Sequence, residues 1–357
     1  LSAASGQEVK VTLLTSGSAK SNADYLLSSS TITIPATLFA SQSVLLGSVT
    51  LDTVGDLLNE INETIVIDVD QVTNAMEKDG LQQQTVTILD DDPIPTVTLL
   101  AESATISESA GLTSLTARLS AVSGRVVTVN LKKTGPATAS ADYTLNGSIV
   151  IPEGSIETVV VLAAAHDTIN EFDETVIVDV DTVQNANEVG EQKQTVTIIN
   201  DDPKPSVTLS VGSATLDELT GTTSTPVTAT LSAVSGLDVT ANLKKSGTAT
   251  DGSDYTLNAA IVVPAGSAFA SVTLAVIDDL LNESNETVVI DIDTVTNGTE
   301  FLAQQKTVTI TDDEAVPTVT LSVGSNSMSE TNGSTPMTVA LSAVAGRNVT
   351  VTLKFTG

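Results

Sequence analysis

Residues 162–181 read LAAAHDTINEFDETVIVDVD, and this stretch decides the fold. An apolar segment runs into an acidic loop, and the chain leaves the loop through a segment in which polar and apolar residues alternate, as in a half-buried strand. Within the loop, Asp167, Glu171 and Glu174 lie three or four residues apart. Carboxylates this close repel one another, so a loop that carries them needs either strong solvation or a bound hard cation.

Nearly the same stretch occurs twice more, as GDLLNEINETIVIDV from Gly55 and as DDLLNESNETVVIDI from Asp278. A second motif, LSAVSG or LSAVAG, starts at Leu119, Leu231 and Leu341, at intervals of about 111 residues. A repeat of this length has the size of a domain, whereas the repeats of solenoid proteins are much shorter. The sequence therefore predicts tandem copies of one domain.

Prolines that follow paired acidic residues mark the predicted domain boundaries. The sequence divides into a domain that lacks its first strands (1–92), two complete domains (93–202 and 203–314), and the opening strands of a further domain (315–357). The linkers are short and contain proline, so we expect neighbouring domains to lie close together. The partial end domains indicate a segment of a longer array. The alternative is a protomer whose missing strands come from a neighbouring chain by strand addition.

Val and Thr dominate the periodic segments, and no segment has a helical period. About seven strands in a unit of this size favour an all-β fold, a series of tandem immunoglobulin-like β-sandwiches in a head-to-tail rod. In residues 93–202 the alternation predicts seven strands: Thr96–Leu100 together with Ala104–Ile106, then Ser114–Leu119, Val126–Lys132, Tyr143–Ile151, Glu157–Ala164, Thr175–Asp181 and Gln194–Ile199.

The composition excludes several classes of function. The chain of 357 residues has a formal net charge of -30, one His, no Cys and no Trp. Such an acidic protein is not expected to bind nucleic acid, and no apolar run is long enough for a membrane helix. Disulfides and thiolate metal sites are excluded, and aromatic residues are too few for a sugar-binding platform. No nucleophile motif recurs, so an enzyme is not expected.

Topology predicts that the acidic residues of one domain converge. In an antiparallel sandwich alternate loops share a pole, and the acidic residues of 93–202 follow alternate strands. Calcium accepts six to eight oxygen ligands and tolerates irregular geometry, whereas magnesium requires a strict octahedron. Zinc and copper prefer His and Cys ligands. The residues expected at this pole are Glu108, Asp142, Asp167, Glu171, Glu174, Asp201 and Asp202.

Three of these features together resemble the Calx-β family: the paired acids after the last strand, the Asp-Tyr after the third strand, and the D-x-x-x-E-x-x-E loop. The resemblance implies an immunoglobulin-like sandwich with a calcium cluster at its distal loops. In 93–202 it implies the seven residues just named. In the other domains it implies as ligands Asp24, Asp56, Glu60, Glu63, Asp90, Asp91, Asp92, Glu218, Asp254, Asp278, Asp279, Glu283, Glu286, Asp312, Asp313 and Glu330.

Some positions depart from this pattern. His166 stands where the third domain has Asp278, and Asn200 and Thr311 are interpreted as replacements of the first acid of the triple that starts at Asp90. The second and third domains are therefore expected to bind fewer calcium ions, or to bind them more weakly.

The leading hypothesis is a non-enzymatic, secreted or cell-surface protein of a bacterium, part of an adhesin or filament. Calcium at the domain junctions would stiffen the rod, since millimolar external calcium suits weak sites. Expected partners are neighbouring repeats of the same or an identical chain and a cell-surface or matrix target. Two alternatives remain open: a regulatory calcium-sensor module, and a strand-exchanging protomer of a homopolymeric extracellular filament.

Overall fold

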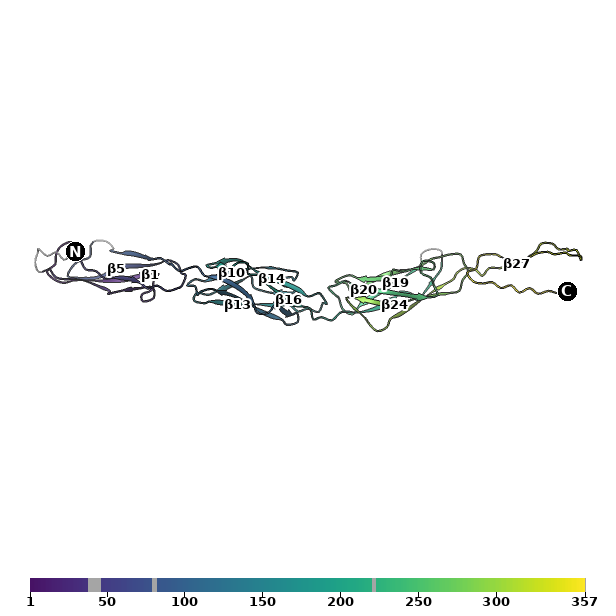
Figure 1. Ribbon diagram of the computed structural model, residues 1–357, viewed down its shortest axis with the longest axis horizontal. Coiled ribbons are helices and arrows are strands. Elements are labelled where there is room, and N and C mark those ends of the chain that lie inside the picture. The colour runs from purple at the N-terminus through teal and green to yellow at the C-terminus, as the bar shows by residue number, and fades with distance from the viewer. Residues whose placement is uncertain (38–45, 79–81, 220–222, 357) are drawn as a thin grey trace. The chain divides into compact units, whose positions relative to one another are not determined.

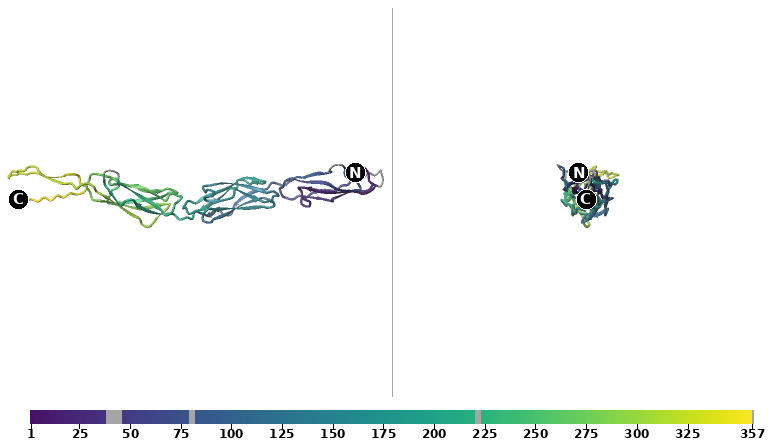
Figure 2. Two further views of the ribbon diagram at one scale, coloured as in Figure 1. Left: turned by 180° about the vertical axis from the view of Figure 1, so that it is seen from behind. Right: turned by 90° about the vertical axis from the view of Figure 1, so that its left-hand side faces the viewer.

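The computed structural model describes residues 1–37, 46–78, 82–219 and 223–356, so Gly357, which ends the fourth predicted domain, lies outside the described residues. Within these ranges the chain forms strands and no helix, and the ribbon shows arrows joined by loops (Figure 1, Figure 2). The described residues accordingly contain no helix that is long and apolar enough to cross a membrane. The predicted all-β fold is confirmed.

The chain forms two compact units. The first contains Leu1–His166 and Glu174–Ile199, and the second contains Asp167–Asp173 and Asn200–Gly357. The acidic loop that follows His166 therefore belongs to the second unit, although the strands on either side of it belong to the first.

The second repeat is a sandwich of two five-stranded sheets, with strand orders β12-β10-β14-β16-β8 and β11-β13-β9-β7-β15 (Figure 1). Strands β8 and β15 pair in parallel at the edges, with β16 and β7 respectively. The bounds are β7 Thr96–Ala101, β8 Thr105–Ser107, β9 Leu112–Leu119, β10 Val127–Thr134, β11 Tyr143–Thr144, β12 Ser148–Ile151, β13 Glu157–Ala164, β14 Glu174–Gln184, β15 Asn187–Glu188 and β16 Gln194–Ile199.

One predicted strand of this repeat is wrong in detail. The segment 143–151 forms two short strands in different sheets, because Tyr143 pairs with Ala164 of β13 whereas Ile151 pairs with Val127 of β10. The chain crosses from one sheet to the other between β11 and β12.

The third repeat has the same arrangement, strand for strand, with orders β21-β23-β19-β17-β25 and β18-β26-β24-β20-β22. The bounds are β17 Ser206–Val211, β18 Thr215–Asp217, β19 Ser224–Leu231, β20 Val239–Gly247, β21 Tyr255–Thr256, β22 Ala260–Val263, β23 Phe269–Val276, β24 Glu286–Thr296, β25 Thr299–Glu300 and β26 Gln305–Thr311.

Alternating residues of both sheets form the core of each complete repeat. Val127 and Val129 of β10 are fully buried, as are Leu115 of β9 and Val196 of β16. All four belong to one cluster of apolar side chains, so the two sheets pack face to face as in an immunoglobulin-like sandwich. Burial of these side chains supplies the main favourable free energy of folding.

The first repeat has a smaller core. Its sheets are β3-β1-β5-β6 and β2-β4. Val86 of β6 is 41% exposed, whereas its counterpart Val196 is fully buried. No strands equivalent to β7, β8 and β9 occur in the described part of residues 1–92. Equivalents of these strands therefore do not cover Val86. The bounds are β1 Val9–Gly17, β2 Tyr25–Leu27, β3 Thr31–Ile34, β4 Leu51–Thr53, β5 Glu63–Thr73 and β6 Gln84–Ile88.

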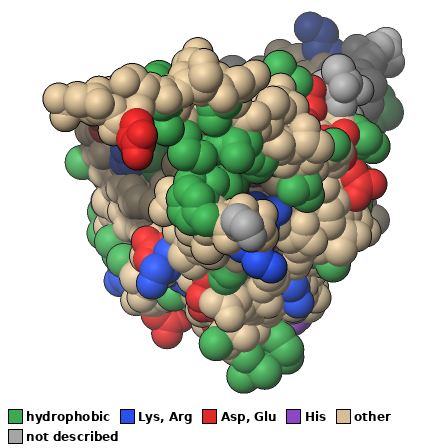
Figure 3. Space-filling model, turned by 90° about the vertical axis from the view of Figure 1, so that its right-hand side faces the viewer, with side chains coloured by type: hydrophobic (Ala, Val, Ile, Leu, Met, Phe, Trp, Pro, Cys, Tyr) green, Lys and Arg blue, Asp and Glu red, His purple; other side chains and the backbone are tan. Residues whose placement is uncertain are grey.

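The fourth repeat consists of one antiparallel pair, β27 (Val319–Val323) and β28 (Met337–Leu341). Its apolar side chains are exposed; Leu321, for example, is 51% exposed. Figure 3, which views the molecule from the side of the C-terminus, shows hydrophobic side chains exposed together on this face.

Candidate metal centre

Each acidic loop ends in a carboxylate at the start of a long central strand, and a separate loop carries a carboxylate just before a buried tyrosine. Glu63 and Glu286 are the first residues of β5 and β24. Asp24 and Asp254 precede Tyr25 and Tyr255, which are 3% and 2% exposed and so anchor their short strands in the core. A rigid strand and a buried ring therefore fix the positions of these carboxylates.

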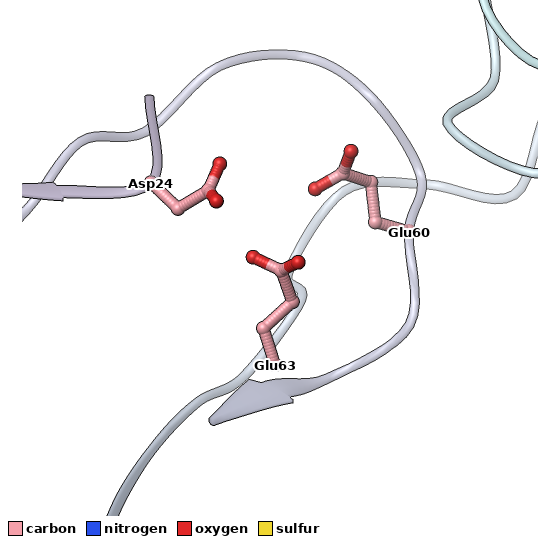
Figure 4. A group of neighbouring side chains, drawn as sticks. All are labelled: Asp24, Glu60 and Glu63. Carbon is pink, nitrogen blue, oxygen red and sulfur yellow. The ribbon is translucent and has the colours of Figure 1, made fainter. Parts of the chain in front are cut away.

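These residues form a triad in the first repeat. Carboxylate oxygens of Asp24, Glu60 and Glu63 lie within 4.8 Å of one another. Figure 4 shows their carboxylates pointing toward a common centre. A hollow at this pole is lined by all seven acidic residues predicted for the repeat, namely Asp24, Asp56, Glu60, Glu63, Asp90, Asp91 and Asp92.

The third repeat has the equivalent triad. Oxygens of Asp254, Glu283 and Glu286 also lie within 4.8 Å of one another. The same three positions of the motif therefore converge in two separate repeats, and the arrangement follows from the repeated sequence.

Two further groups occur at the same pole of the third repeat. Glu218, Asp312 and Glu314 form one group, and Asp278, Asp313 and Glu314 form the other, each with oxygens within 4.8 Å. Glu314, which sequence reasoning missed, belongs to both. Its signal was the DDE at 312–314, which corresponds to the DDD at 90–92 of the first repeat.

The structure corrects the interpretation of Thr311. The oxygens of Asp90 accept hydrogen bonds from Asn59 Nδ2 (2.9 Å) and from the Glu60 amide (3.0 Å). Those of Asp312 accept the equivalent bonds from Asn282 Nδ2 (3.0 Å) and the Glu283 amide (2.7 Å). Asp312 therefore occupies the place of Asp90, and the third repeat keeps a complete acidic triple at 312–314.

In the second repeat the same place belongs to Asn200, whose Oδ1 accepts from the Glu171 amide at 3.1 Å. This neutral side chain keeps the backbone contact but supplies no charge. The predicted ligands of this repeat belong to both compact units. Glu108, Asp142 and Glu174 are in the first unit, and Asp167, Glu171, Asp201 and Asp202 are in the second.

The remaining predicted residues lie around these groups. Asp56, Asp167 and Asp279 each accept a hydrogen bond from the amide two residues later, at 2.7, 2.7 and 2.6 Å, and so close the turn of the acidic loop. Glu330 lies exposed in a turn, outside the acidic groups found in the described residues.

The electrostatics of the pole disfavour ionised carboxylates. Burial, assisted by Asp279 and other acids, raises the pKa of Glu218 to about 7. Burial, with a hydrogen bond to Asp254 and the charges of Asp254 and Glu283, raises the pKa of Glu286 to about 7. Burial and neighbouring acids also raise the pKa values of Glu60 and Glu63. A bound cation would remove this penalty.

The donor atoms fit a hard cation. Every member of the triads is a carboxylate, and oxygen ligands are those that calcium prefers. Glu314 Oε2 is buried and has no hydrogen-bond partner within the described residues, as expected of an oxygen reserved for a metal. The ion pairs Lys10–Glu8, Arg118–Glu157 and Lys245–Asp251 lie outside these groups.

A comparison with curated proteins gives no match. Similar solved structures include CBD12 from CALX1.2, at 16% identity over 55% of this chain and 79% of that chain, with a TM-score of 0.27. The calcium binding domain CBD12 of CALX1.1 is 16% identical over 54% and 77% of the two chains, with a TM-score of 0.26. The apo-form Calx CBD1 domain is 17% identical over 31% of this chain and 100% of that chain, also with a TM-score of 0.26.

The sequence pattern of the Calx-beta domain matches four consecutive segments, residues 1–92, 90–203, 200–314 and 312–356. Together these segments span nearly the whole chain. The protein therefore belongs to the Calx-beta domain family, as four tandem repeats.

Proposed function

We propose that this chain is a calcium-binding structural region of a bacterial extracellular surface, adhesin or filament protein, in which calcium stiffens the junctions between repeats. The observation that carries the proposal is the pair of equivalent triads, Asp24–Glu60–Glu63 and Asp254–Glu283–Glu286, each with oxygens within 4.8 Å. Three carboxylates held this close without a counter-ion destabilise the fold, so their recurrence favours a bound cation.

In this mechanism calcium supplies positive charge at the pole. Residues of the chain orient the carboxylates. Asn59 and the Glu60 amide donate hydrogen bonds to Asp90, and Glu63 lies at the start of β5. One side-chain donor and one backbone donor thus keep Asp90 in place before any ion binds. The weakly held members of the triad, repelled by their neighbours, would be ordered on binding.

The acidic loop adjoins the following repeat, which supports a role at the junction. A Cβ atom added at Gly124 would lie 2.5 Å from Glu60 Cγ, and one at Gly346 would lie 2.6 Å from Glu283 Cγ. Glycine at these two positions therefore lets the backbone of the next repeat approach the proposed ligand side chain. A calcium ion that fixes the glutamate side chain would also restrict the turn that contains this glycine.

Terbium luminescence tests ion binding, because Tb³⁺ replaces Ca²⁺ at oxygen sites and is excited by nearby tyrosine. Tyr25 and Tyr255 each follow a triad aspartate, and the chain has no tryptophan. We expect luminescence on tyrosine excitation that calcium displaces. Glu63→Gln with Glu286→Gln should reduce it strongly, whereas Asp293→Asn, an exposed acid on β24 away from the triad, should not.

Small-angle scattering of the same samples tests stiffening. Adding calcium should increase the maximum dimension of the chain, and the distribution of that dimension should become narrower. A luminescence signal that calcium fails to displace would refute the site, and unchanged scattering in the presence of bound calcium would refute the mechanical role.

A further inference from the structure

An asparagine of each acidic loop pairs with a turn of the following repeat. Asn59 forms an isolated parallel bridge with Ser123, and Asn170 forms the same bridge with Ser235. Asn282 pairs with Ala345. Each of these pairs lies within one compact unit. The turns belong to the LSAVSG and LSAVAG motifs, so both partners of the contact recur with the repeat.

Backbone hydrogen bonds hold this contact. The amides of Gly124 and Gly236 donate to the carbonyl oxygens of Asn59 and Asn170, both at 3.1 Å. The amide of Gly346 donates to Asn282 O at 3.0 Å. The hydroxyl of Ser235, which is 1% exposed, donates to Asn170 O at 3.1 Å.

The asparagine side chains are buried and hold their own repeat. Asn59, Asn170 and Asn282 are 5%, 6% and 3% exposed. Their Nδ2 atoms donate to the carbonyl oxygens of Asp92, Asp202 and Glu314 at 3.2, 3.1 and 2.9 Å, respectively. Each asparagine therefore ties the acidic end of its own repeat to the turn of the next one. We call this arrangement of asparagine, glycine and the residue after the glycine the clasp.

The three clasps differ at the side-chain oxygen of the asparagine. Asn282 Oδ1 accepts a hydrogen bond from Arg347 Nη2 at 3.1 Å, and Arg347 Nη1 also lies 3.4 Å from Ser284 Oγ. The Oδ1 atoms of Asn59 and Asn170 are buried without a hydrogen-bond partner among the described residues. A buried amide oxygen without a donor costs free energy.

The residue after the glycine also differs among the three clasps. It is Arg347 at the third clasp, Arg125 at the first and Leu237 at the second. Arg125 occupies the same position as Arg347, but Asn59 Oδ1 has no hydrogen-bond partner among the described residues, so the first clasp is open in this structure. Leucine carries no donor, so the second clasp cannot be closed in this way.

We infer that an arginine after the turn glycine strengthens the contact of that turn with the asparagine of the acidic loop. Arg347 closes the clasp on the buried oxygen of Asn282, and Leu237 leaves the contact between Asn170 and the turn at Ser235 weaker than this one. This inference does not depend on calcium, because every contact that carries it is a hydrogen bond within the chain.

Hydrogen exchange of the full chain in a chelator, followed by mass spectrometry of peptides that span the three turns, tests the inference. A hydrogen bond from a charged donor to a buried acceptor changes the opening equilibrium by about tenfold or more. We expect Leu237→Arg to slow exchange of the Gly236 amide by about tenfold and Arg347→Leu to accelerate exchange of the Gly346 amide by about tenfold. Arg347→Lys, which keeps a charged donor, should retain part of the protection.

The matched control is Arg118→Leu, which removes an arginine that pairs with Glu157 and lies away from the clasps. It should leave all three turns unchanged. Unchanged exchange in both Leu237→Arg and Arg347→Leu would overturn the inference, as would an equal effect of Arg118→Leu. Calcium titration of the same variants separates the two proposals, because absence of calcium binding with altered exchange would refute the proposed function alone.

Discussion

Replacing Glu286 by glutamine tests whether the triad of the third repeat exists to hold a cation. The substitution removes one of three charges whose oxygens lie within 4.8 Å of one another. The glutamine amide can still donate a hydrogen bond to Asp254, so the geometry is kept. At pH 8, above the pKa of about 7 to which burial and Asp254 raise Glu286, the wild-type side chain is ionised. The variant therefore isolates the effect of charge.

The distance between the carboxylate oxygens sets the magnitude of their repulsion. Two unit charges at 4.8 Å repel by about 0.9 kcal/mol in water and by about 3.5 kcal/mol at an effective dielectric constant of about 20. The substitution removes two such pairs. Taking the lower value because the site is open to solvent, we expect the metal-free third repeat to gain about 2 kcal/mol, or about 8 °C in its melting temperature.

Calcium should reverse the advantage. At a calcium concentration about 100 times the dissociation constant, a site on the folded form alone stabilises the wild type by about 2.7 kcal/mol. The variant lacks one ligand, so this gain should nearly vanish. Tyrosine fluorescence of Tyr255 during thermal unfolding measures the third repeat selectively in a background with Tyr25→Phe and Tyr143→Phe, because the chain has three tyrosines and no tryptophan.

Asp293→Asn is the control, since this exposed acid lies on the same strand but outside the triad. It should change neither the metal-free melting temperature nor the response to calcium by more than about 0.5 kcal/mol. A Glu286→Gln variant that is less stable than the wild type in a chelator, or that responds equally to calcium, would refute the reasoning.

Three further predictions concern stability. In a chelator, the free energy of unfolding measured in urea should fall as the pH rises from about 4.5 to about 7. Burial raises the pKa of Glu218 to about 7, so the folded protein holds a proton that the unfolded chain releases. A free energy of unfolding that rises over this interval would contradict the assignment. Gly247→Ala should cost about 2 kcal/mol or more, since Gly247 has a φ of 121° and a Cβ atom would overlap the carbonyl oxygen of Thr287, and fluorescence of Tyr255 in urea would detect it. Val196→Ala should lower the free energy of unfolding of the second repeat by about 2 kcal/mol. Val86→Ala, at a 41% exposed position, should lower that of the first repeat by less than about 0.5 kcal/mol. Equal losses would contradict the explanation by burial.

Much of this fold could be predicted from alternation and repetition. Val127, Val129 and Leu131 face one way in the sequence pattern, and all three are buried in the structure. The period tells which face of a strand is apolar but does not tell which sheet the strand joins. The segment 143–151 was for that reason predicted as one strand, although its two ends pair with β13 and β10.

The acidic triads could also be located, because their residues recur at the same positions of each repeat. The role of the asparagine in each acidic loop could not be derived. Asn59 is polar and lies in a loop, which indicates exposure, yet it is 5% exposed because the next repeat covers it. Its burial arises from a contact with Ser123, 64 residues away in the sequence, and a single loop carries no signal of that contact. The recurrence of L-N-E or I-N-E at 58–60, 169–171 and 281–283 was the one available sign.

Isothermal titration of the full, metal-stripped chain with calcium tests the central claim most directly. The account predicts saturable binding of at least two ions per chain, one for each of the triads Asp24–Glu60–Glu63 and Asp254–Glu283–Glu286. Glu63→Gln and Glu286→Gln should each remove one ion, and Asp293→Asn should remove none. Absence of saturable binding at millimolar calcium, or full binding by the double variant, would contradict the account and leave the acidic poles as solvated surface.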